Sequence, residues 1–416
     1  MTIATTATTT GPIAGLRCRT CGVLQPRDER FVCERCLGAV EPEYDLHALA
    51  SSGVREAIER GPRTLWRYAP LLPCAQPARG LAVGWTPLTQ APRLGEALGI
   101  DDLWLKDDTR NPSLSFKDRP VALATARALE LGLDTIACAS TGNLAGAVAA
   151  AAAKAGLRAY VFVPETTEAS KVAAASSFGA TVVRVRGNYD RVNRLCGTLA
   201  DDLGWGFVNF TLRPYYAEGS KTLLFEIAEQ LGWRLPDHVV IPVGSGALLT
   251  RTSTAAAQLV GTRLVADAPC RISAAQPAGC APVSDAVLEE WRPVRAVRRP
   301  ETIASALAIG APADGDASVD VVRRTGGSAA SVRDADIALG CELLARTEGV
   351  LVEPAGGVVV ATARELARRG VFRKDERVVL YLTGNGHKGF PAEAALREPI
   401  DADADAFAAQ YPEARS

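Results

Sequence analysis

The chain has 416 residues, of which 48% are hydrophobic, and a formal net charge of −1. This length and composition predict a globular protein of two or three domains with a large core. The balanced charge gives no reason to expect nucleic acid or a membrane surface as a partner, and no apolar run approaches the roughly 18 residues that span a bilayer. Residues 1–13 lack the blocks of a secretion signal, so we expect a disordered tail on a cytoplasmic protein.

Residues 14–46 carry two Cys-x-x-Cys pairs, the spacing of a zinc ribbon in which each pair gives two thiolates to one tetrahedral ion. Four reduced surface thiols are the plain alternative. A redox dithiol is not favoured because the motif lacks a strand-to-helix setting. A catalytic ion is not favoured because four thiolates leave no open coordination position. We predict a structural zinc ion held by Cys18, Cys21, Cys33 and Cys36.

After a connecting arm of residues 47–84, the chain alternates apolar runs with alanine-rich helices. This alternation is typical of an α/β fold in which open, mostly parallel sheets carry helices on both faces. We expect two such domains, over residues 85–212 and 213–400, and an acidic tail over 401–416. The predicted strands are 103–106, 135–139, 158–163, 181–185, 238–243 and 378–382, with helices after Lys117 and over 144–155.

One lysine stands in the segment Asn111-Pro-Ser-Leu-Ser-Phe-Lys117-Asp-Arg-Pro120, between a turn and a predicted helix. Of the few lysines in the chain, Lys117 alone lies in a short polar loop at a strand-to-helix crossing. A lysine without a functional role is unfavourable near the positive end of a helix dipole. The position of Lys117 therefore indicates a functional role. A lysine that forms a Schiff base needs a partly desolvated site. We therefore predict that Lys117 is a Schiff-base lysine.

Two further loops follow predicted strands, Ser140-Thr-Gly-Asn143 and Gly244-Ser-Gly-Ala-Leu248. The first suits a carboxylate, because helix N-termini offer unpaired donors, and Asn143 can donate to a phenolate. The second suits a phosphate, but it fits neither the dinucleotide fingerprint nor the Walker pattern. Each motif alone is weak, since Gly-Asn is a routine turn. The order of lysine, Asn loop and glycine loop indicates a pyridoxal phosphate enzyme.

Together these stretches resemble the threonine synthases, which are fold-type-II pyridoxal phosphate enzymes with a fold like that of the tryptophan synthase β subunit. The resemblance covers roughly residues 16–390, including the cysteine-rich leader. Ser115-Phe-Lys-Asp-Arg119 is similar to the family's signature around its cofactor lysine, and Ala139-Ser-Thr-Gly-Asn143 to its substrate and cofactor-ring loop. Glu218-Gly-Ser-Lys-Thr222, Ile309-Gly-Ala-Pro312 and Leu382-Thr-Gly-Asn-Gly386 also recur in the family with small variations.

The resemblance implies a role for each matching residue. Lys117 would hold the cofactor and then move protons as general acid and base, and Phe116 would pack near the ring. Asn143 would bind the phenolic oxygen. Thr383 would face the pyridine nitrogen. A hydroxyl partner, unlike an Asp carboxylate, does not force this nitrogen to be protonated. The cofactor phosphate would bind to Gly244, Ser245, Gly246, Ala247 and Leu248.

The implied reaction converts O-phospho-L-homoserine and water to L-threonine and phosphate, by elimination at the γ carbon and addition at the β carbon. Such a reaction needs a carboxylate site and a cationic site for the leaving phosphate. Arg213 has an alternative role in supporting a tyrosine turn, and Lys171 as a solvated surface residue. The expected substrate-binding residues are Ser140, Thr141, Gly142, Lys171, Arg213 and Lys221. A homodimer is expected from the resemblance alone.

Departures from the family pattern at Pro120, Leu144 and His387 keep two alternatives open. The first is a paralogue that performs β-replacement or elimination on O-phosphoserine, serine or threonine, similar to cysteate synthase or a dehydratase. The second is a zinc-ribbon binding module joined to an inactive cofactor domain. The presence of Lys117, Asn143 and Thr383 disfavours this second alternative, as does the lack of a basic composition suited to nucleic acid.

Overall fold

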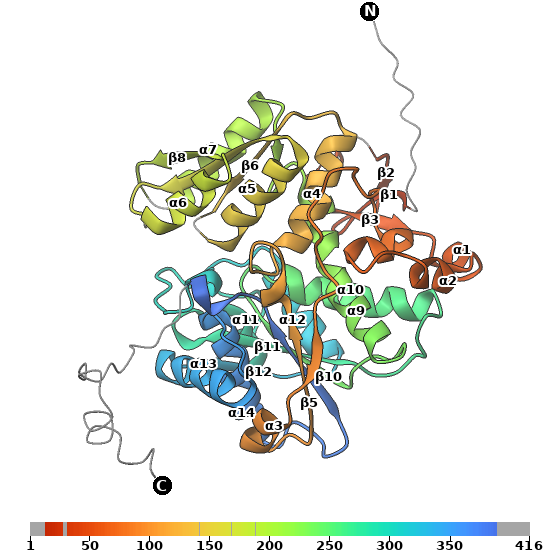
Figure 1. Cartoon of the computed structure of the whole chain (residues 1–416), viewed down its shortest axis with the longest axis vertical. Helices are drawn as coiled ribbons and strands as arrows, with labels where there is room; N and C mark the ends of the chain where they lie inside the picture. The colour runs from red at the N-terminus through yellow and green to blue at the C-terminus, as the bar shows by residue number, and fades with distance from the viewer. Residues whose placement is uncertain (1–12, 28–30, 141, 168, 188, 389–416) are drawn as a thin grey trace, which may run out of the picture.

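The computed structural model describes residues 13–388, apart from residues 28–30, 141, 168 and 188. The backbone forms two α/β lobes, one above the other in Figure 1, with a small β ribbon beside them. The described residues contain no helix long and apolar enough to span a membrane. The tails expected over residues 1–13 and 401–416 lie outside the described part of the chain, except Ile13, which begins the first strand.

The N-terminal ribbon is an antiparallel sheet in the order β2-β1-β3. Its apolar side chains pack with Leu65 and Trp66 of the connecting arm and with Leu123 of the smaller lobe, so the ribbon is anchored to the body of the protein. The strands are β1 (Ile13–Cys18), β2 (Leu24–Gln25) and β3 (Val40–Tyr44), and the arm contains α1 (Leu46–Ala50), α2 (Val54–Glu59) and the 3-10 helix η1 (Leu65–Leu71).

The larger lobe is built on a six-stranded sheet in the order β12-β11-β10-β13-β5-β4, parallel except at β4. Helices cover both faces, which is why the central strands β10 and β13 are mainly apolar. In β10, Val239 and Ile241 join one core cluster and Val240 joins the other, because successive side chains point to opposite faces. The strands are β4 (Leu88–Gln90), β5 (Asp102–Asp107), β10 (His238–Pro242), β11 (Arg271–Pro277), β12 (Ala329–Val332) and β13 (Arg377–Leu382).

Two groups of helices cover this sheet, each sharing one of the two core clusters. One face carries α9 (Thr222–Gln230), α10 (Ala247–Gly261), α11 (Pro282–Leu288) and α12 (Gly315–Arg324). The other carries α3 (Pro92–Leu98), α13 (Asp334–Glu348) and α14 (Pro354–Arg368). Short 3-10 helices complete the lobe: η2 (Asp108–Arg110), η4 (Ala278–Cys280), η5 (Ser305–Leu307) and η6 (Gly386–Lys388).

The smaller lobe has a four-stranded parallel sheet in the order β8-β7-β6-β9. Its strands are β6 (Thr135–Ala139), β7 (Arg158–Pro164), β8 (Thr181–Val185) and β9 (Gly206–Phe207). The helices α4 (Asp118–Glu130), α5 (Asn143–Ala155) and α6 (Ala169–Ser177) cover one face, and α7 (Tyr189–Asp202) covers the other. The chain returns to the larger lobe through α8 (Arg213–Glu218) and η3 (Gly219–Lys221).

The predicted strands are all present, and the α/β fold with open, mostly parallel sheets is confirmed. The domain division differs, because β4 and β5 (residues 88–107) pair with the C-terminal strand β13 instead of the strands of residues 135–207. Sequence order does not determine which strands pair. The sequence did not predict β11 and β12, whose Ala and Ser residues have low β propensity; burial between neighbouring strands overrides that propensity.

The strand order β10-β13-β5 places three loops at one edge of the larger sheet. All three strands are parallel, so their carboxyl ends lie together, where ligands bind in open α/β sheets. The loop after β5 carries Lys117, the loop after β13 carries Thr383, and the loop after β10 carries the glycine segment 244–248. Segments that are far apart in the sequence therefore meet at one site.

Candidate active site and metal centre

Lys117 lies at the N-terminus of α4, at the end of the loop that follows β5. The Phe116 N–H donates to the Thr383 carbonyl at 2.9 Å, and Ser115 forms a β-bridge with Gly384. Leu114 turns the chain through a left-handed conformation, with φ of 62°. The backbone on the N-terminal side of Lys117 is therefore held against the loop after β13.

The Lys117 amine is half-buried between two aromatic rings. Its Nζ lies 5.4 Å from the ring centre of Phe116 and 6.0 Å from that of Tyr216. Within the part of the chain that the structure describes, this amine has no hydrogen-bond or ion-pair partner. Partial desolvation without a carboxylate partner suits an amine that must lose its proton in order to attack a carbonyl carbon.

Arg119 anchors the same segment in the core. It is fully buried, and its guanidinium donates to Asp108 and to Glu226, each at 2.6 Å. The buried Lys106 amine donates to Glu226 at 2.7 Å. Burial raises the pKa of the Glu226 carboxyl, but Arg119 and then Lys106 outweigh burial and hold this pKa at about 2. The charges of the two cations thus balance those of the two carboxylates. These ion pairs fix the start of α4, just after Lys117.

Asn143, the first residue of α5, faces the larger lobe. Its Nδ2 donates to both carboxylate oxygens of Glu353, at 2.8 and 3.0 Å, and its Oδ1 accepts from the Lys388 amine at 3.0 Å. The Glu353 N–H in turn donates to the Gly384 carbonyl at 3.0 Å. The Asn143 side chain is therefore in contact with the same loop that contacts Phe116.

The glycine loop joins β10 to the start of α10. Gly246 has φ of 90°, a conformation that side-chain-bearing residues rarely adopt, and a Cβ there would lie 2.5 Å from the Ser318 hydroxyl. The N-cap residue Gly246 makes no side-chain cap bond to this 15-residue helix, and the first amides of an α-helix have no partner within the helix. Asp314 closes the loop, because its N–H donates to the Ser245 carbonyl at 2.9 Å. Such a turn at a helix N-terminus is suited to a phosphate group.

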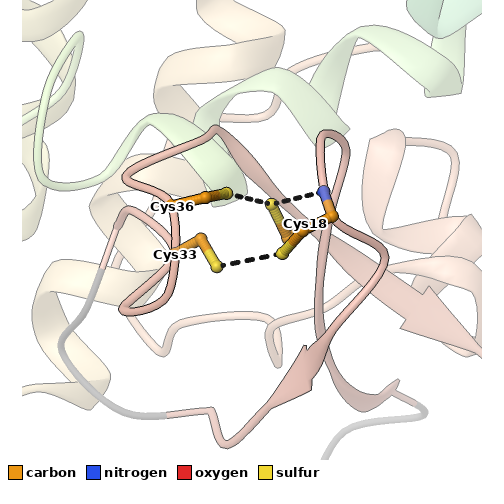
Figure 2. A group of neighbouring side chains, drawn as sticks. Cys18, Cys33 and Cys36 are labelled. Carbon is orange, nitrogen blue, oxygen red and sulfur yellow. Dashed lines mark hydrogen bonds between the residues drawn. The ribbon is translucent and has the colours of Figure 1, made fainter.

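The ribbon carries a four-cysteine cluster at the turns that flank its strands. All four sulfurs lie within 4.8 Å of one another, and Figure 2 shows Cys33 and Cys36 on one loop facing Cys18 on the other. Sulfur separations of 3.5 and 3.6 Å between the two Cys-x-x-Cys turns approach the ~3.8 Å expected when four sulfurs surround one zinc at about 2.3 Å. The Cys21 N–H points at the Cys18 sulfur and, with the Thr20 N–H, lowers the pKa of this thiol to about 6. The donor set therefore fits a structural zinc ion.

Known proteins are similar to this chain in sequence. The sequence profile of the family described as pyridoxal-phosphate dependent enzyme matches residues 80–384. A threonine synthase of Methanocaldococcus jannaschii is 34% identical over 395 residues, which cover 94% of this chain and 96% of that protein. A threonine synthase of Methanosarcina acetivorans is 36% identical over 374 residues, covering 89% of this chain and 91% of that protein. This chain belongs to the threonine synthase family of pyridoxal-phosphate dependent enzymes.

A solved structure of the same fold supports the architecture. The processed form of threonine deaminase isoform 2 from Solanum lycopersicum matches with a TM-score of 0.61 at 23% sequence identity, over 72% of this chain and 79% of that chain. At this identity the match shows the fold alone. It confirms the predicted fold-type-II arrangement of two α/β lobes.

The residues of this threonine synthase family member fit pyridoxal phosphate. The Lys117 amine is available, and the loop at Gly246 is a cradle that a Cβ would fill. Leu248 is buried, so its backbone N–H and not its side chain is the group that a phosphate would meet. Thr383 is half-buried, and its hydroxyl has no hydrogen-bond partner within the described segments. Each of these groups lies at the edge of the sheet where β5, β10 and β13 end.

Of the three cations predicted for the leaving phosphate, the structure describes the side chains of two, Arg213 and Lys221. Arg213 begins α8, and its guanidinium donates to Asp314 at 3.3 Å, so it lies beside the glycine loop. Lys221 is fully buried, is paired with Glu218 at 2.5 Å and lies 4.2 Å from the ring centre of Tyr44. This placement corrects its predicted role, because a buried and paired amine does not reach a substrate. The side chain of Lys171 lies outside the described atoms.

The predicted carboxylate loop follows β6 in the smaller lobe. The Ser140 hydroxyl accepts from the Gly142 N–H at 3.2 Å, and Gly142 is exposed. Thr141 lies outside the described part of the chain. The loop therefore presents Ser140 and Gly142 next to Asn143 and opposite the larger lobe.

Sequence reasoning missed Glu353, Lys388 and Asp314, which contact the predicted site residues. Glu353 stands in Val352-Glu-Pro-Ala-Gly, just before α14, and Lys388 ends η6. The signals available in the sequence were a carboxylate directly before a proline that begins a helix, and a rare lysine near the Thr-Gly-Asn-Gly loop. Neither signal identifies the partner, which depends on how the two lobes meet.

Proposed function

We propose that this enzyme is a threonine synthase, which converts O-phospho-L-homoserine and water to L-threonine and phosphate. The observation that carries the proposal is the 34% identity to a threonine synthase across 94% of this chain and 96% of that protein. The alternatives that act on O-phosphoserine, serine or threonine are not favoured, and neither is an inactive cofactor domain.

Pyridoxal phosphate, when bound, withdraws electrons from the substrate α carbon and so makes its proton acidic. The residues that would hold it are Lys117, the Asn143 amide, the Thr383 hydroxyl and the backbone of the loop from Gly244 to Leu248. The Phe116 ring, which is 6% exposed, would give the cofactor an apolar neighbour. A phosphate would meet the positive end of α10.

Lys117 would act as the general acid and base. Once the substrate amine has displaced it, its Nζ would take the α proton and then a β proton, and it would give one proton to the γ carbon as the phosphate leaves. It would then take a proton from the water that adds at the β carbon and return a proton to the α carbon, while the third proton leaves with the phosphate. The rings of Phe116 and Tyr216 shield this amine from bulk water. Excluding bulk water protects the reactive carbons until the one productive water adds.

Substrate binding would use both lobes. Ser140, Thr141 and Gly142 would bind the α-carboxylate through their amides and hydroxyls at the start of α5. Arg213 would receive the leaving phosphate, since its guanidinium is 42% exposed beside the glycine loop. Lys171 stays a candidate for the same phosphate. Lys388 joins this set because its amine already reaches Asn143 at the site.

The zinc ion would have a structural role, because four thiolates complete its coordination. We also propose that the enzyme works in the cytoplasm, where reduced cysteines persist, and that it is a homodimer. The described cysteines form no disulfide with one another, which agrees with a reducing compartment.

The test uses purified protein with added pyridoxal phosphate and O-phospho-L-homoserine, and it measures phosphate and threonine together. Equal amounts of both products are expected, and Lys117→Ala should reduce their formation by about 100-fold or more. Lys154→Ala is the matched control, since this lysine is exposed at the end of α5. Phosphate release without threonine, or faster turnover of O-phospho-L-serine, would overturn the proposal.

A further inference from the structure

The zinc ribbon reaches the glycine loop through Arg19, which lies in the turn between Cys18 and Cys21. The backbone of this turn is fixed within the ribbon, because the Arg19 N–H donates to the Ala39 carbonyl at 2.9 Å. The side chain leaves the ribbon, and its Nη1 donates to Asp314 of the larger lobe at 2.6 Å. A residue between two metal-site cysteines thus contacts the lobe that carries the cofactor phosphate loop.

Asp314 holds the glycine loop through its backbone. Its N–H donates to the Ser245 carbonyl at 2.9 Å, and its own carbonyl accepts from the Ser318 hydroxyl at 2.7 Å. The same carbonyl lies 2.7 Å from where a Cβ of Gly246 would be. A displacement of Asp314 would therefore disturb the Ser245–Gly246 turn just before α10.

The Asp314 carboxylate is 6% exposed, and its two oxygens have different partners. Oδ1 accepts from Arg19 and Oδ2 from Arg213, at 2.6 and 3.3 Å. The contact to Arg19 is the shorter of the two, and Arg213 is the more exposed cation, at 42% against 31%. Arg19 is therefore the better-placed partner to fix the carboxylate.

A second contact of the ribbon lies further along α10. Glu41 of β3 accepts from Arg19 at 3.2 Å and also from Arg251 of α10. Arg251 in turn donates to the buried Glu218 at 3.1 Å, which accepts from the Tyr44 hydroxyl at 2.7 Å. The ribbon thus contacts both α10 and Asp314, the residue that closes the glycine loop before α10.

We propose that Arg19 is a positioning residue for the cofactor phosphate: by holding Asp314, it keeps the Ser245–Gly246 turn in the conformation that binds the phosphate. The zinc-bound ribbon would then fix the position of the Arg19 backbone. The proposal depends on pyridoxal phosphate binding at Lys117 but not on which substrate the enzyme uses.

The test compares two ligands that differ only in the phosphate. The apoenzyme of Arg19→Gln is titrated with pyridoxal phosphate and with pyridoxal, and the bound chromophore is followed by absorbance. The matched control is Arg17→Gln, which removes an exposed ion pair with Glu43 inside the ribbon (3.1 Å) and does not reach the larger lobe. This binding measurement does not require activity. It would therefore remain a valid test if the protein failed the threonine synthase assay.

Arg19→Gln should weaken pyridoxal phosphate roughly fivefold, the scale of one partly exposed ion pair, and leave pyridoxal unchanged. Arg17→Gln should change neither affinity, and Arg19→Lys should recover part of the loss. Equal weakening of both ligands would overturn the proposal, because that is the result of a general loss of structure. Unchanged affinity for pyridoxal phosphate would overturn it as well.

A double-mutant cycle tests the route through Asp314. Asp314→Asn alone should weaken the binding of pyridoxal phosphate more than that of pyridoxal. Adding Arg19→Gln should weaken it no further, because the ion pair between Arg19 and Asp314 is already lost in Asp314→Asn. Additive losses would contradict the proposed route, since they would mean that Arg19 and Asp314 act separately.

Discussion

The N–H of Phe116 donates to the carbonyl of Thr383 at 2.9 Å, which joins the lysine loop to the loop after the last strand. This bond lies where β5 and β13 end side by side in the larger sheet. It fixes the backbone of both residues without using either side chain. The Thr383 hydroxyl therefore stays available for the cofactor ring.

Replacing Thr383 tests this hydroxyl alone. Thr383→Val keeps the size of the side chain and the backbone bond to Phe116, so we expect pyridoxal phosphate to bind within about twofold of its normal affinity. The kcat should fall about tenfold, equivalent to about 1.4 kcal/mol, since the pyridine nitrogen loses its partner. Steady-state kinetics and cofactor titration check both values. Thr383→Ser should retain kcat, and an unchanged kcat in the Val variant would refute the assigned role.

Gly246→Ala tests the geometry of the phosphate loop. The left-handed φ of 90° costs a residue with a side chain about 1–2 kcal/mol, and the new Cβ would lie 2.5 Å from the Ser318 hydroxyl and 2.7 Å from the Asp314 carbonyl. We expect a loss of about 2 kcal/mol or more in the free energy of unfolding, measured by urea denaturation, and weaker binding of pyridoxal phosphate.

The control for this loss is Gly146→Ala in α5, where a Cβ meets nothing within 4 Å and no positive φ is present. Alanine should stabilise this helix by roughly 0.5–1 kcal/mol. Opposite signs for the two substitutions are the expected result. A destabilisation of equal size at both positions would contradict the conformational argument.

The buried network around Arg119 predicts a pH dependence of stability. The pKa of Glu226 is held at about 2 in the folded protein, below its usual 4.5. A depressed carboxyl pKa adds stability that is fully present above pH 4.5 and is lost as the pH falls toward 2. Glu226→Gln should cost about 3 kcal/mol at pH 7, because it leaves Arg119 and Lys106 short of a partner charge.

Urea unfolding at a series of pH values measures this effect. The difference between the native protein and Glu226→Gln should be constant above pH 4.5 and should shrink below it. Glu342→Gln is the control, because its pair with Arg346 is exposed and should contribute below about 1 kcal/mol at any pH. A difference in the free energy of unfolding that grows as the pH falls below 4.5 would contradict the lowered pKa of Glu226.

The cysteine cluster predicts one zinc ion per chain. Cys33→Ser should lose the ion, and hydrogen exchange in β1 and β3 should rise by about tenfold or more, because metal binding contributes directly to the folding free energy of such ribbons. Metal analysis and exchange mass spectrometry measure the two effects. Cys270→Ser, outside the cluster, should keep the zinc. A metal-free native protein with a protected ribbon would contradict the prediction.

The leaving phosphate gives a kinetic prediction. Arg213→Gln and Lys388→Met each remove an exposed cation at the site, so the KM for O-phospho-L-homoserine should rise roughly fivefold to tenfold. Lys374→Met serves as the control, since this exposed lysine lies before β13, at the other end of that strand. Unchanged KM values in both site variants would contradict this prediction and would favour Lys171 as the residue that binds the leaving phosphate.

The sequence alone determined the local features of this enzyme. The lysine loop, the glycine loop before α10 and the two Cys-x-x-Cys turns are formed by neighbouring residues, whose turn and helix preferences act over a few positions. The alternation of apolar runs and helices likewise indicated the parallel sheets. Lys117, the glycine segment and the zinc cysteines could therefore be predicted before any coordinates were known.

Only the tertiary structure decided which of these features meet. The pairing of β5 with β13 brings Lys117 beside Thr383, and the burial of Lys221 against Glu218 removes it from the candidates for substrate binding. Arg19 and Asp314, which lie far apart in the sequence, meet only because the ribbon packs on the larger lobe. Strand partners and ion pairs of this kind depend on the packing of the whole chain, because a local preference carries no information about a partner distant in sequence.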